Sequence, residues 1–175
     1  MPIFSKPEFL EARKNKKHQF FPQSADDQLS WEEVVECVNY NVVNDIYMRK
    51  LNNLTIILHD ASINPKIAKI LEVFGKFEPT VPCTAHMYIS LSKLSETFGW
   101  HKDKGDVVFW QAIGSTKFSV REPDKLYEYN MQPGDMIYVP RGMMHNTEPM
   151  GPRVGISMGL EYGKYDRSEE HTSEL

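Results

Sequence analysis

The sequence predicts a mainly β protein, with helices first and an antiparallel barrel or jelly roll after them. Its second half contains many short β-rich runs, separated by turn signals such as Pro133-Gly134-Asp135. Its first half carries helix start signals followed by apolar residues at helical spacing. No repeat, low-complexity tract or linker divides the chain, so helices and strands are expected to share one domain.

Three helices are expected in the first half. A capping box, in which Ser or Thr precedes Glu by three residues, begins at Ser5 and predicts a helix over residues 7–14. A second capping box begins at Ser30, and Asn64 followed by proline opens a third helix that ends at Gly75. The apolar face expected for the second helix consists of Trp31, Val34, Val35 and Val38.

The strand pattern is clearest in residues 84–92, where small or apolar residues at odd positions alternate with polar residues at even positions. Such alternation is typical of a strand with two different faces. The other β-rich runs cover residues 54–58, 107–113, 116–120, 126–129, 136–139 and 154–160.

Residues 1–166 are expected to form the single domain, with a helical cap and lead-in over about 1–80 and a jelly-roll core over about 84–163. The last nine residues, RSEEHTSEL, equal the in-frame translation of a common sequencing adapter. We therefore treat residues 167–175 as a non-native tail and exclude them, with His171, from the search for functional residues. It follows that a native C-terminal region could be missing.

Charge and composition exclude several classes of protein. The formal net charge is -4, and removing one basic and three acidic tail residues leaves -2, so no strong field for nucleic acid is expected. A basic run over residues 13–18 could touch RNA but is more typical of a solvated face. No apolar run is long enough to span a membrane, and the start does not read as a signal peptide. Two cysteines, Cys37 and Cys83, without a CxxC pair favour a reducing, cytoplasmic location.

The candidate metal ligands are His101, Asp103 and His145. Side chains two apart on a strand point to the same face, so the first two ligands should lie together. A third imidazole from a neighbouring strand would complete a facial triad of two histidines and one carboxylate, which binds Fe(II) and leaves three positions open. His145 follows a strand at a loop, where ligands are commonly held. Ordinary half-buried polar histidines are the alternative for both imidazoles.

Two motifs carry a family resemblance. The chain contains FGWHKDKGDVVFWQAIGSTKFSV and, further on, PGDMIYVPRGMMH, which ends at His145 and is followed by ISMGLEYG. These segments resemble the iron-binding motifs of JmjC-type cupin oxygenases, nearest to the ribosomal-oxygenase branch, and the resemblance covers most of residues 51–163. The matching residues of the first segment are Gly99, His101, Asp103, Asp106, Val107, Gln111, Gly114 and Phe118.

The resemblance implies a double-stranded β-helix, or cupin, fold and an oxidoreductase that uses Fe(II), 2-oxoglutarate and O2. Such a dioxygenase would act as a hydroxylase, and the resemblance suggests a protein side chain, for example of a ribosomal protein, as the substrate. A tRNA base or a small metabolite remains open. The alternatives are a metal-binding cupin that binds a small ligand without redox turnover, and a degenerate, structural cupin. No membrane partner is expected, and the sequence does not indicate the oligomeric state.

One position departs from the family pattern. The family places Lys or Arg where this chain has Thr116, to bind the distal carboxylate of 2-oxoglutarate. Lys117 lies one step later and should face the opposite side, unless a bulge at Gly114 shifts the register. Arg153 is a further candidate, because several other 2-oxoglutarate oxygenases keep an arginine near this position. A solvated turn residue is the alternative for Arg153.

Three serines complete the expected co-substrate contacts. Ser90 and Ser92 align with family positions beside the co-substrate, and Ser157 shares the expected face of Arg153. Strand hydroxyls bonded to the backbone are the alternative for Ser90 and Ser92. Trp110 has the parity of the inward face and could line a substrate cleft, although such aromatic residues usually belong to the core.

Overall fold

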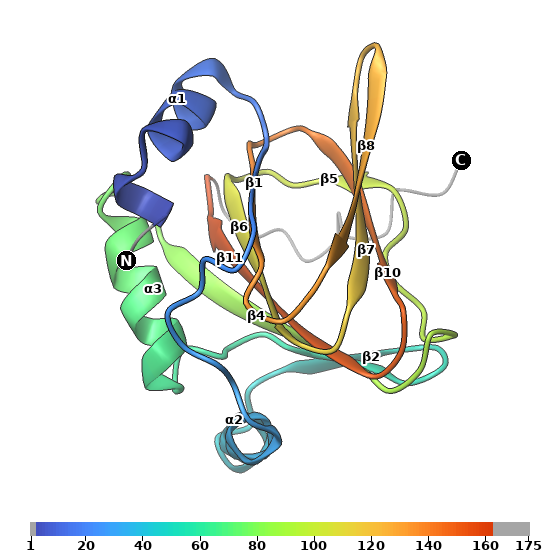
Figure 1. Cartoon of the computed structure of the whole chain (residues 1–175). Coiled ribbons are helices and arrows are strands. Elements are labelled where there is room, and N and C mark those ends of the chain that lie inside the picture. Colours follow the sequence, from blue (N-terminus) through green and yellow to red (C-terminus); the bar gives the residue numbers. More distant parts are fainter. Residues whose placement is uncertain (1–2, 163–175) are drawn as a thin grey trace.

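The protein, described by a computed structural model over residues 3–162, consists of two antiparallel sheets and three α-helices, two along one side of the sheets and one below them in the view of Figure 1. The predicted mainly β jelly-roll class is confirmed. The tail assigned to residues 167–175, and the expected domain end at residues 163–166, lie outside the described residues. None of the helices in the described part is long and apolar enough to cross a membrane.

The helices begin largely where the capping signals predict. A 3-10 turn, η1 (Ile3–Ser5), precedes α1 (Pro7–Asn15), and then come α2 (Trp31–Val43) and α3 (Pro65–Gly75). Both halves of the capping box that begins at Ser30 are present. The capping box expected at Ser5 is wrong. Lys6 is the N-cap residue of α1 and makes no side-chain cap, so a proline in the first turn marks the start of this helix.

The expected apolar face of α2 is wrong in part. Trp31 and Val35 are exposed, whereas Val34 and Cys37 are buried. The buried face continues to Asn41, whose side-chain nitrogen donates to two backbone carbonyl oxygens. A polar residue whose N–H groups find acceptors can occupy a core position, and a search for apolar periodicity overlooks it.

The larger sheet has seven strands in the order β1-β9-β6-β11-β4-β3-β2, and the smaller sheet has four in the order β5-β10-β7-β8. The sequence patterns do not predict β1, β2 or β10, because the first two are short edge strands and the third is mainly polar. The strand bounds are β1 (Gln19–Phe21), β2 (Met48–Leu51), β3 (Thr55–Leu58), β4 (Cys83–Ser90), β5 (His101–Lys102), β6 (Val107–Ile113), β7 (Thr116–Glu122), β8 (Lys125–Met131), β9 (Met136–Val139), β10 (Met144–Pro149) and β11 (Arg153–Leu160).

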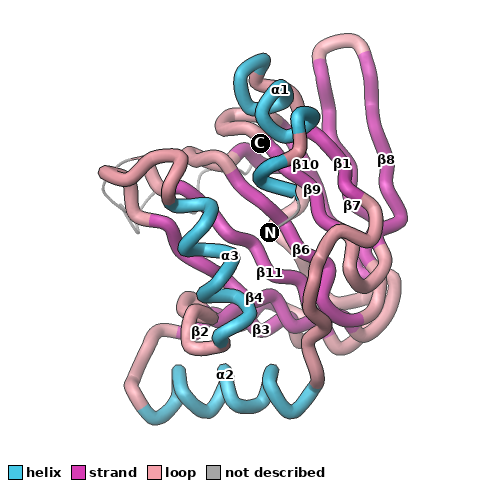
Figure 2. The backbone as a smooth tube through the Cα atoms, turned by 60° about the vertical axis from the view of Figure 1, so that its left-hand side comes forward, coloured by secondary structure: helices cyan, strands magenta, loops and turns pink. Residues whose placement is uncertain are grey.

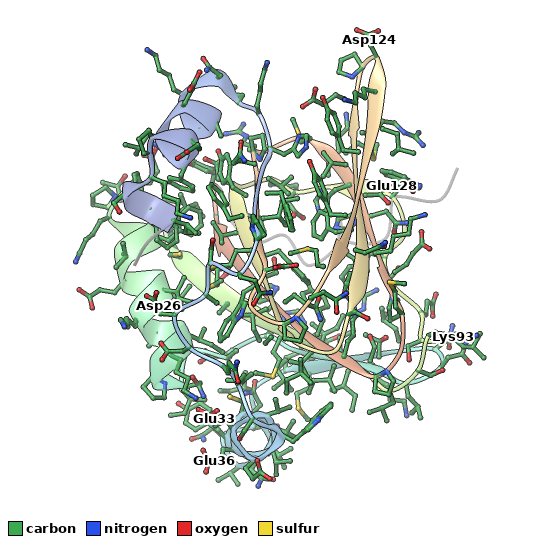
Figure 3. The ribbon with its side chains drawn as sticks, in the orientation of Figure 1. Asp26, Glu33, Glu36, Lys93, Asp124 and Glu128 are labelled. Carbon is green, nitrogen blue, oxygen red and sulfur yellow. The ribbon has the colours of Figure 1, made fainter. Side chains whose placement is uncertain are left out.

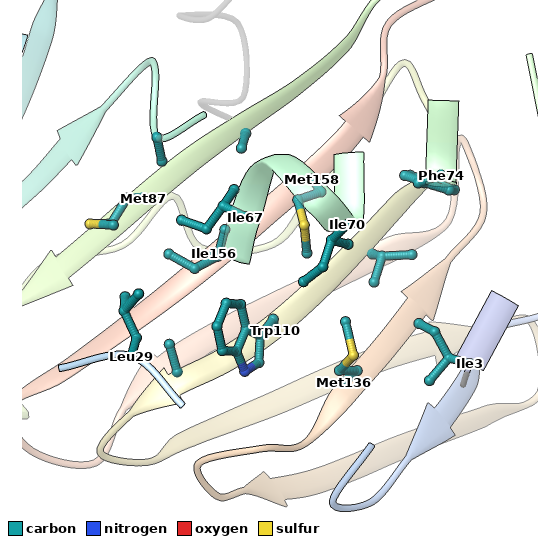
Figure 4. Close-up of a cluster of buried hydrophobic side chains, with 14 of the residues drawn as sticks. Ile3, Leu29, Ile67, Ile70, Phe74, Met87, Trp110, Met136, Ile156 and Met158 are labelled. Carbon is teal, nitrogen blue, oxygen red and sulfur yellow. The ribbon is translucent and has the colours of Figure 1, made fainter. Parts of the chain in front are cut away.

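One face of the larger sheet packs against the helices (Figure 2). Its side chains pack with Ile67, Ile70 and Phe74 of α3 in the main hydrophobic core (Figure 4). Trp110 lies in this core and is 1% exposed, so it does not line a cleft. Removal of this apolar area from water is the main stabilisation expected for the sheet.

The opposite face of the larger sheet faces the smaller sheet. An apolar cluster fills one part of the space between them, and a cavity occupies the other part. This second apolar cluster includes Phe109, Phe118 and Ile137. The cavity has a volume of about 540 Å³ and is lined mainly by residues of β4, β10, β11 and the segment around β5. The β7–β8 hairpin of the smaller sheet extends beyond the neighbouring strands and carries Asp124 at its tip (Figure 3).

Candidate active site

The three candidate metal ligands meet at one end of the smaller sheet. Their donor atoms all lie within 4.8 Å of one another. Nε2 of His145 lies 3.4 Å from Oδ2 of Asp103, and Nε2 of His101 lies 3.9 Å from Oδ1 of the same carboxylate. The fold therefore brings together two ligands from one short segment and a third that follows much later in the sequence.

Strand pairing explains this convergence. β5 and β10 are antiparallel neighbours, and His101 lies directly opposite His145 in their register. Asp103 follows β5, and its carbonyl oxygen accepts a hydrogen bond from the backbone N–H of Gly142 at 2.9 Å. This bond ties the loop after β5 to the turn before β10, so both ligand-bearing segments are fixed to each other through the backbone.

Both imidazoles are oriented for metal binding by backbone carbonyl groups. Nδ1 of His101 lies 2.8 Å from the carbonyl oxygen of Gly99, and Nδ1 of His145 lies 3.0 Å from that of Met143. A carbonyl accepts only from a protonated nitrogen, so these contacts assign the proton of each neutral ring to Nδ1. The Nε2 lone pairs are then left to face Asp103, which is the arrangement found around metal-binding histidines.

The electrostatics of the site keep the carboxylate ionised. Burial raises the pKa of Asp103, but its contacts with His145 and His101 outweigh burial and hold the pKa below its ordinary value. Burial lowers the pKa of His101, and the neighbouring His145 lowers it further. For His145 burial also lowers the pKa, but the Asp103 carboxylate outweighs it and raises the pKa.

The donor set suits Fe(II). Two neutral imidazole nitrogens and one carboxylate form the facial triad of non-haem iron oxygenases, with three further positions open on the ion. The triad opens onto the cavity, since His101, Asp103 and His145 all line it. His145 is 5% exposed, and the stacked ring of Phe118 covers one of its faces at 5.7 Å between centroids. The residues present therefore fit a metal ion that also carries a co-substrate.

A buried arginine lies on another wall of the same cavity. Arg153 begins β11 and is 1% exposed, yet among residues 3–162 its hydrogen-bond partners are two hydroxyl groups and no carboxylate. Nη1 donates to Oγ1 of Thr116 at 2.7 Å, and Nε donates to Oγ of Ser90 at 3.4 Å. Burial lowers the pKa of Arg153 to about 10, so the side chain stays charged at neutral pH. A buried cation without an anionic partner is costly unless a ligand supplies the negative charge.

Glycine at position 114 allows this arrangement. Gly114 has a positive φ of 66°, and a Cβ atom there would lie 2.1 Å from the carbonyl oxygen of Pro152. The β6–β7 turn can therefore approach the start of β11 closely, which places Thr116 beside Arg153. The register shift of the larger sheet lies between β6 and β11, at Val154 and Gly155, and not in β7.

Lys117, one of the predicted co-substrate residues, lies away from the cavity. Its side chain points away from the cavity on β7, and its Nζ lies 2.7 Å from Oε1 of Glu128 on the neighbouring strand β8. The register shift considered at Gly114 therefore does not turn Lys117 inward.

The predicted serines divide between the cavity and its surroundings. Ser157 lines the cavity, opposite His86 of β4, and Ser90 holds the guanidinium of Arg153. Ser92 lies in the turn after β4, where its hydroxyl accepts a hydrogen bond from the backbone N–H of Leu94 at 3.1 Å. The hydroxyl of Ser92 is therefore bonded to the backbone, as the alternative in the sequence analysis proposed. The hydroxyl of Ser90 instead contacts the side chain of Arg153.

The search for site residues in the sequence missed His86 and Tyr88. Both lie on the polar face of β4 and line the same cavity as the metal ligands and Arg153. The alternation of residues 84–92 contains the necessary signal, because the apolar face packs into the core and the polar face must point elsewhere. Alternation alone does not say that the polar face borders a cavity rather than solvent.

Comparisons with known proteins agree with this architecture. A family described as the JmjC domain matches residues 117–167, which include His145 and Arg153 but less than half of the chain. The structure of YcfD, a ribosomal oxygenase from Escherichia coli, in complex with cobalt and 2-oxoglutarate superposes with a TM-score of 0.68 at 15% identity, over 91% of this chain and 52% of that one. The α-ketoglutarate-dependent epimerase SnoN from nogalamycin biosynthesis superposes with a TM-score of 0.58 at 12% identity, over 89% of this chain and 83% of that one.

At these identities the structural likeness establishes the jelly-roll fold that the sequence predicts. The chain spans about half the length of the ribosomal oxygenase structures that it matches. No curated protein sequence matches the chain.

Proposed function

We propose that this protein is an Fe(II)- and 2-oxoglutarate-dependent dioxygenase that hydroxylates a protein side chain. One observation supports this assignment above the others. A triad of two histidines and one carboxylate shares a cavity with Arg153, a buried cation that has no acidic partner among the described residues. A metal site and a buried cation in one cavity suit a ligand that chelates the metal at one end and carries an acid at the other, as 2-oxoglutarate does.

The side chains divide the work between them. His101, Asp103 and His145 would hold the iron on one face, and the iron with O2 and 2-oxoglutarate supplies the oxidising chemistry. Arg153 would bind the distal carboxylate of 2-oxoglutarate with a charge-assisted hydrogen bond, and Thr116 would orient the guanidinium. In this way Arg153 replaces the basic residue that the family has at position 116.

An apolar wall completes the site. The rings of Phe109 and Phe118 line the cavity and also belong to the second apolar cluster, so they are held by packing. Such a wall helps to exclude water from the place where the chemistry occurs.

The relatives support the substrate class. YcfD is described as a ribosomal oxygenase, and its complex contains cobalt and 2-oxoglutarate. The likeness to a ribosomal oxygenase favours a protein substrate for this chain, and a ribosomal protein is the narrower version of the proposal. A small molecule is the alternative that the likeness to the epimerase SnoN favours. Two cysteines that form no disulfide with each other suit action in the cytoplasm.

A metal-binding cupin that binds a small ligand without redox turnover is the second candidate. The observation in its favour is Thr116, since a neutral hydroxyl stands where the oxygenase family has a cation. The two candidates differ in one product. An oxygenase forms succinate from 2-oxoglutarate, whereas a passive cupin binds its ligand and releases it unchanged.

The test is therefore succinate formation by protein supplied with Fe(II), 2-oxoglutarate and O2. We expect Asp103→Ala to abolish it, because the substitution removes the anionic ligand of the triad. The matched control is Asp124→Ala, which removes a carboxylate at the tip of the β7–β8 hairpin and should leave succinate formation unchanged. An iron-free sample measures the background.

Turnover without the prime substrate can be slow, so the assay is repeated with cell lysate as a source of substrate. Succinate that depends on Fe(II) and is lost in Asp103→Ala would support the oxygenase. If wild-type protein and Asp103→Ala form equal amounts even with lysate, the oxygenase assignment is wrong and the passive cupin becomes the better account.

A further inference from the structure

A second cluster of titratable side chains lies outside the candidate active site, where the segment before β1 meets the β7–β8 hairpin. His18 provides the central imidazole, and its side chain is only 5% exposed. Nδ1 of His18 lies 3.0 Å from Oε1 of Glu122, and Nε2 lies 2.9 Å from the hydroxyl oxygen of Tyr129. The cluster therefore joins an acid, an imidazole and a phenol in one row of hydrogen bonds.

The chemistry of the partners assigns the protons of this row. A carboxylate only accepts hydrogen bonds, so the proton of the neutral imidazole lies on Nδ1 and is donated to Glu122. Nε2 then carries a lone pair, and Tyr129 donates its hydroxyl proton to it. Burial lowers the pKa of His18 and outweighs the neighbouring carboxylate, which keeps the ring neutral at neutral pH. The order of acid, imidazole and hydroxyl is that of a catalytic triad, with a phenol in the place of the serine.

The phenol of Tyr129 keeps its proton at rest, so it is neither a nucleophile nor a base. A tyrosine has an ordinary pKa of about 10. Burial raises the pKa of Tyr129 further. A protonated phenol can still give up an electron if its proton leaves with the electron, because loss of the electron alone would create a positive charge in a partly buried place. Nε2 of His18 is placed to take that proton.

One aromatic ring separates Tyr129 from the metal ligands. Phe118 of β7 stacks on the imidazole of His145, with 5.7 Å between the ring centroids and 7° between the ring planes. Tyr129 of β8 lies directly opposite Phe118 in the β7–β8 register, so both side chains lie on the same face of the smaller sheet. Phe118 belongs to the second apolar cluster, and Tyr129 packs against that cluster. Packed rings therefore connect the metal site to the phenol.

We propose that Tyr129 is a redox-active residue, which gives one electron to the iron site when the iron has been oxidised and no prime substrate lies in the cavity. The proposal rests on the proposed function, because O2 and 2-oxoglutarate supply the oxidising iron. In this step the O–H bond of Tyr129 breaks, its electron reduces the iron by one electron, and its proton forms the Nε2–H bond of His18. Tyr129 is left as a neutral phenoxyl radical, and the Glu122 carboxylate stabilises the new imidazolium.

Two other tyrosines lack this combination of features. Tyr127 lies on the same face of β8 and packs its ring on His18 with 4.5 Å between centroids, but the hydroxyl that lies against Nε2 is that of Tyr129. Tyr138 donates its hydroxyl to Asp106 at 3.1 Å, but it lies in the main core on the helix side of the larger sheet. Tyr129 combines a proton acceptor with a place beside the rings that reach the iron site.

The first experiment looks for the radical. Protein loaded with Fe(II) and 2-oxoglutarate is mixed with O2 without prime substrate, frozen at a series of times and measured by electron paramagnetic resonance, and mass spectrometry locates the oxidised residue. We expect a phenoxyl signal in wild type that is lost in Tyr129→Phe and kept in the matched control Tyr127→Phe. A signal that survives in Tyr129→Phe, or oxidation at Tyr88 or Trp100 in its place, would overturn the proposal.

The second experiment asks whether His18 accepts the proton or only holds the hairpin. His18→Ala should slow radical formation about a hundredfold, the lower end of the range for a positioned proton acceptor. Added imidazole should restore much of the rate, because it can occupy the place of the missing ring, and it should not restore a radical in Tyr129→Phe. Urea unfolding checks that each variant is folded. Wild-type rates in folded His18→Ala, or no rescue by imidazole, would contradict the proton transfer.

Glu122→Gln provides a second variant in case His18→Ala does not fold. It keeps an acceptor for the Nδ1–H group but removes the negative charge that stabilises the imidazolium. Radical formation should therefore be slower than in wild type and faster than in His18→Ala. A wild-type rate in Glu122→Gln would show that no imidazolium forms in the step.

A third measurement separates failure of this proposal from failure of the proposed function. Succinate is measured in the same samples, and its absence even with cell lysate would count against the oxygenase assignment. The pair of Tyr129 and His18 is then tested in metal-free protein, in which photo-oxidised ruthenium tris(bipyridine) removes one electron. Mass spectrometry should find Tyr129 oxidised faster in wild type than in His18→Ala. Equal oxidation in the two proteins would show that the phenol is not coupled to the imidazole, whatever the iron site does.

Discussion

The two faces of the larger sheet have opposite characters, although the same strands build both. On β4 and β11 the side chains that point toward the helices are apolar and almost completely buried. The side chains that point the other way line the cavity and are mostly polar. The helix-facing residues are Ala85, Met87, Ile89, Val154, Ile156 and Met158, and the cavity-facing ones are Thr84, His86, Tyr88, Arg153 and Ser157.

This difference indicates that stability and chemistry are separated by strand parity rather than by position in the sequence. A one-residue step along β11 exchanges a core contact for a cavity contact. Substitutions at neighbouring residues should therefore have different consequences, with loss of stability on one face and loss of ligand binding on the other.

The largest effect on stability is expected at Ile156. It is 0% exposed in the main core, so Ile156→Ala should lower the free energy of unfolding by about 2–5 kcal/mol. Its neighbour Ser157 lines the cavity, and Ser157→Ala should change that free energy by no more than about 0.5 kcal/mol. Urea unfolding of both variants without ligand measures the difference, and equal destabilisation would mean that the two faces are not separated energetically.

Much of the fold follows from local signals in the sequence. The bounds of α3, β6 and β9 match the expected ranges, because each has strong start or stop residues and a continuous apolar pattern. The patterns do not predict β1 and β10. Three residues are too few to show alternation, and the ladder of β10 with β7 and β5 is made by the backbone of a segment whose side chains are largely polar.

The site residues that belong to a sequence motif can be predicted, whereas those placed only by tertiary packing cannot. The spacing of His101 and Asp103 and the motif that ends at His145 name the metal ligands. The burial of Arg153 cannot be derived in this way, because the sequence after Gly151-Pro152 also reads as a solvated turn. It depends on the close approach of the β6–β7 turn to β11, which is a contact between residues distant in the sequence.

Arg153 provides a way to sharpen the comparison, because a single substitution should affect ligand binding and stability in opposite directions. Arg153→Met removes the cation assigned to the distal carboxylate, so 2-oxoglutarate binding should weaken by about 1.5–3 kcal/mol. Without ligand the variant should be as stable as wild type or more stable, since it replaces a buried charge that has hydroxyl partners with an apolar side chain. Calorimetry and urea unfolding give the two numbers. A lower free energy of unfolding for the variant without ligand would show that Arg153 stabilises the fold rather than serving to bind the co-substrate.

Gly155 is an expected exception to the separation of the two faces, because a substitution on the cavity-facing side should here lower the stability of the fold. It lies on the cavity-facing side of β11, yet a Cβ atom there would come within 2.3 Å of the Phe109 ring. Gly155→Ala should therefore destabilise the fold by about 1–3 kcal/mol, the range for overpacking. The double variant with Phe109→Leu should regain part of this loss, because the smaller side chain makes room. Strictly additive effects of the two substitutions on the free energy of unfolding would contradict a direct clash.

The smallest effect is expected at Lys117, the other cation that the sequence offers for 2-oxoglutarate. It lies next to Thr116 in the sequence but on the opposite face of β7, where its Nζ pairs with Oε1 of Glu128 at 2.7 Å. Exposed ion pairs contribute little to stability, so Lys117→Ala should leave the urea midpoint unchanged within error. Affinity for 2-oxoglutarate should also match wild type, because no ligand in the cavity can reach across the strand. A loss of affinity comparable to that of Arg153→Met would show that β7 changes register when the co-substrate binds, and that Lys117 then turns inward. In that case the parity of β7, unlike that of β11, would depend on the ligand.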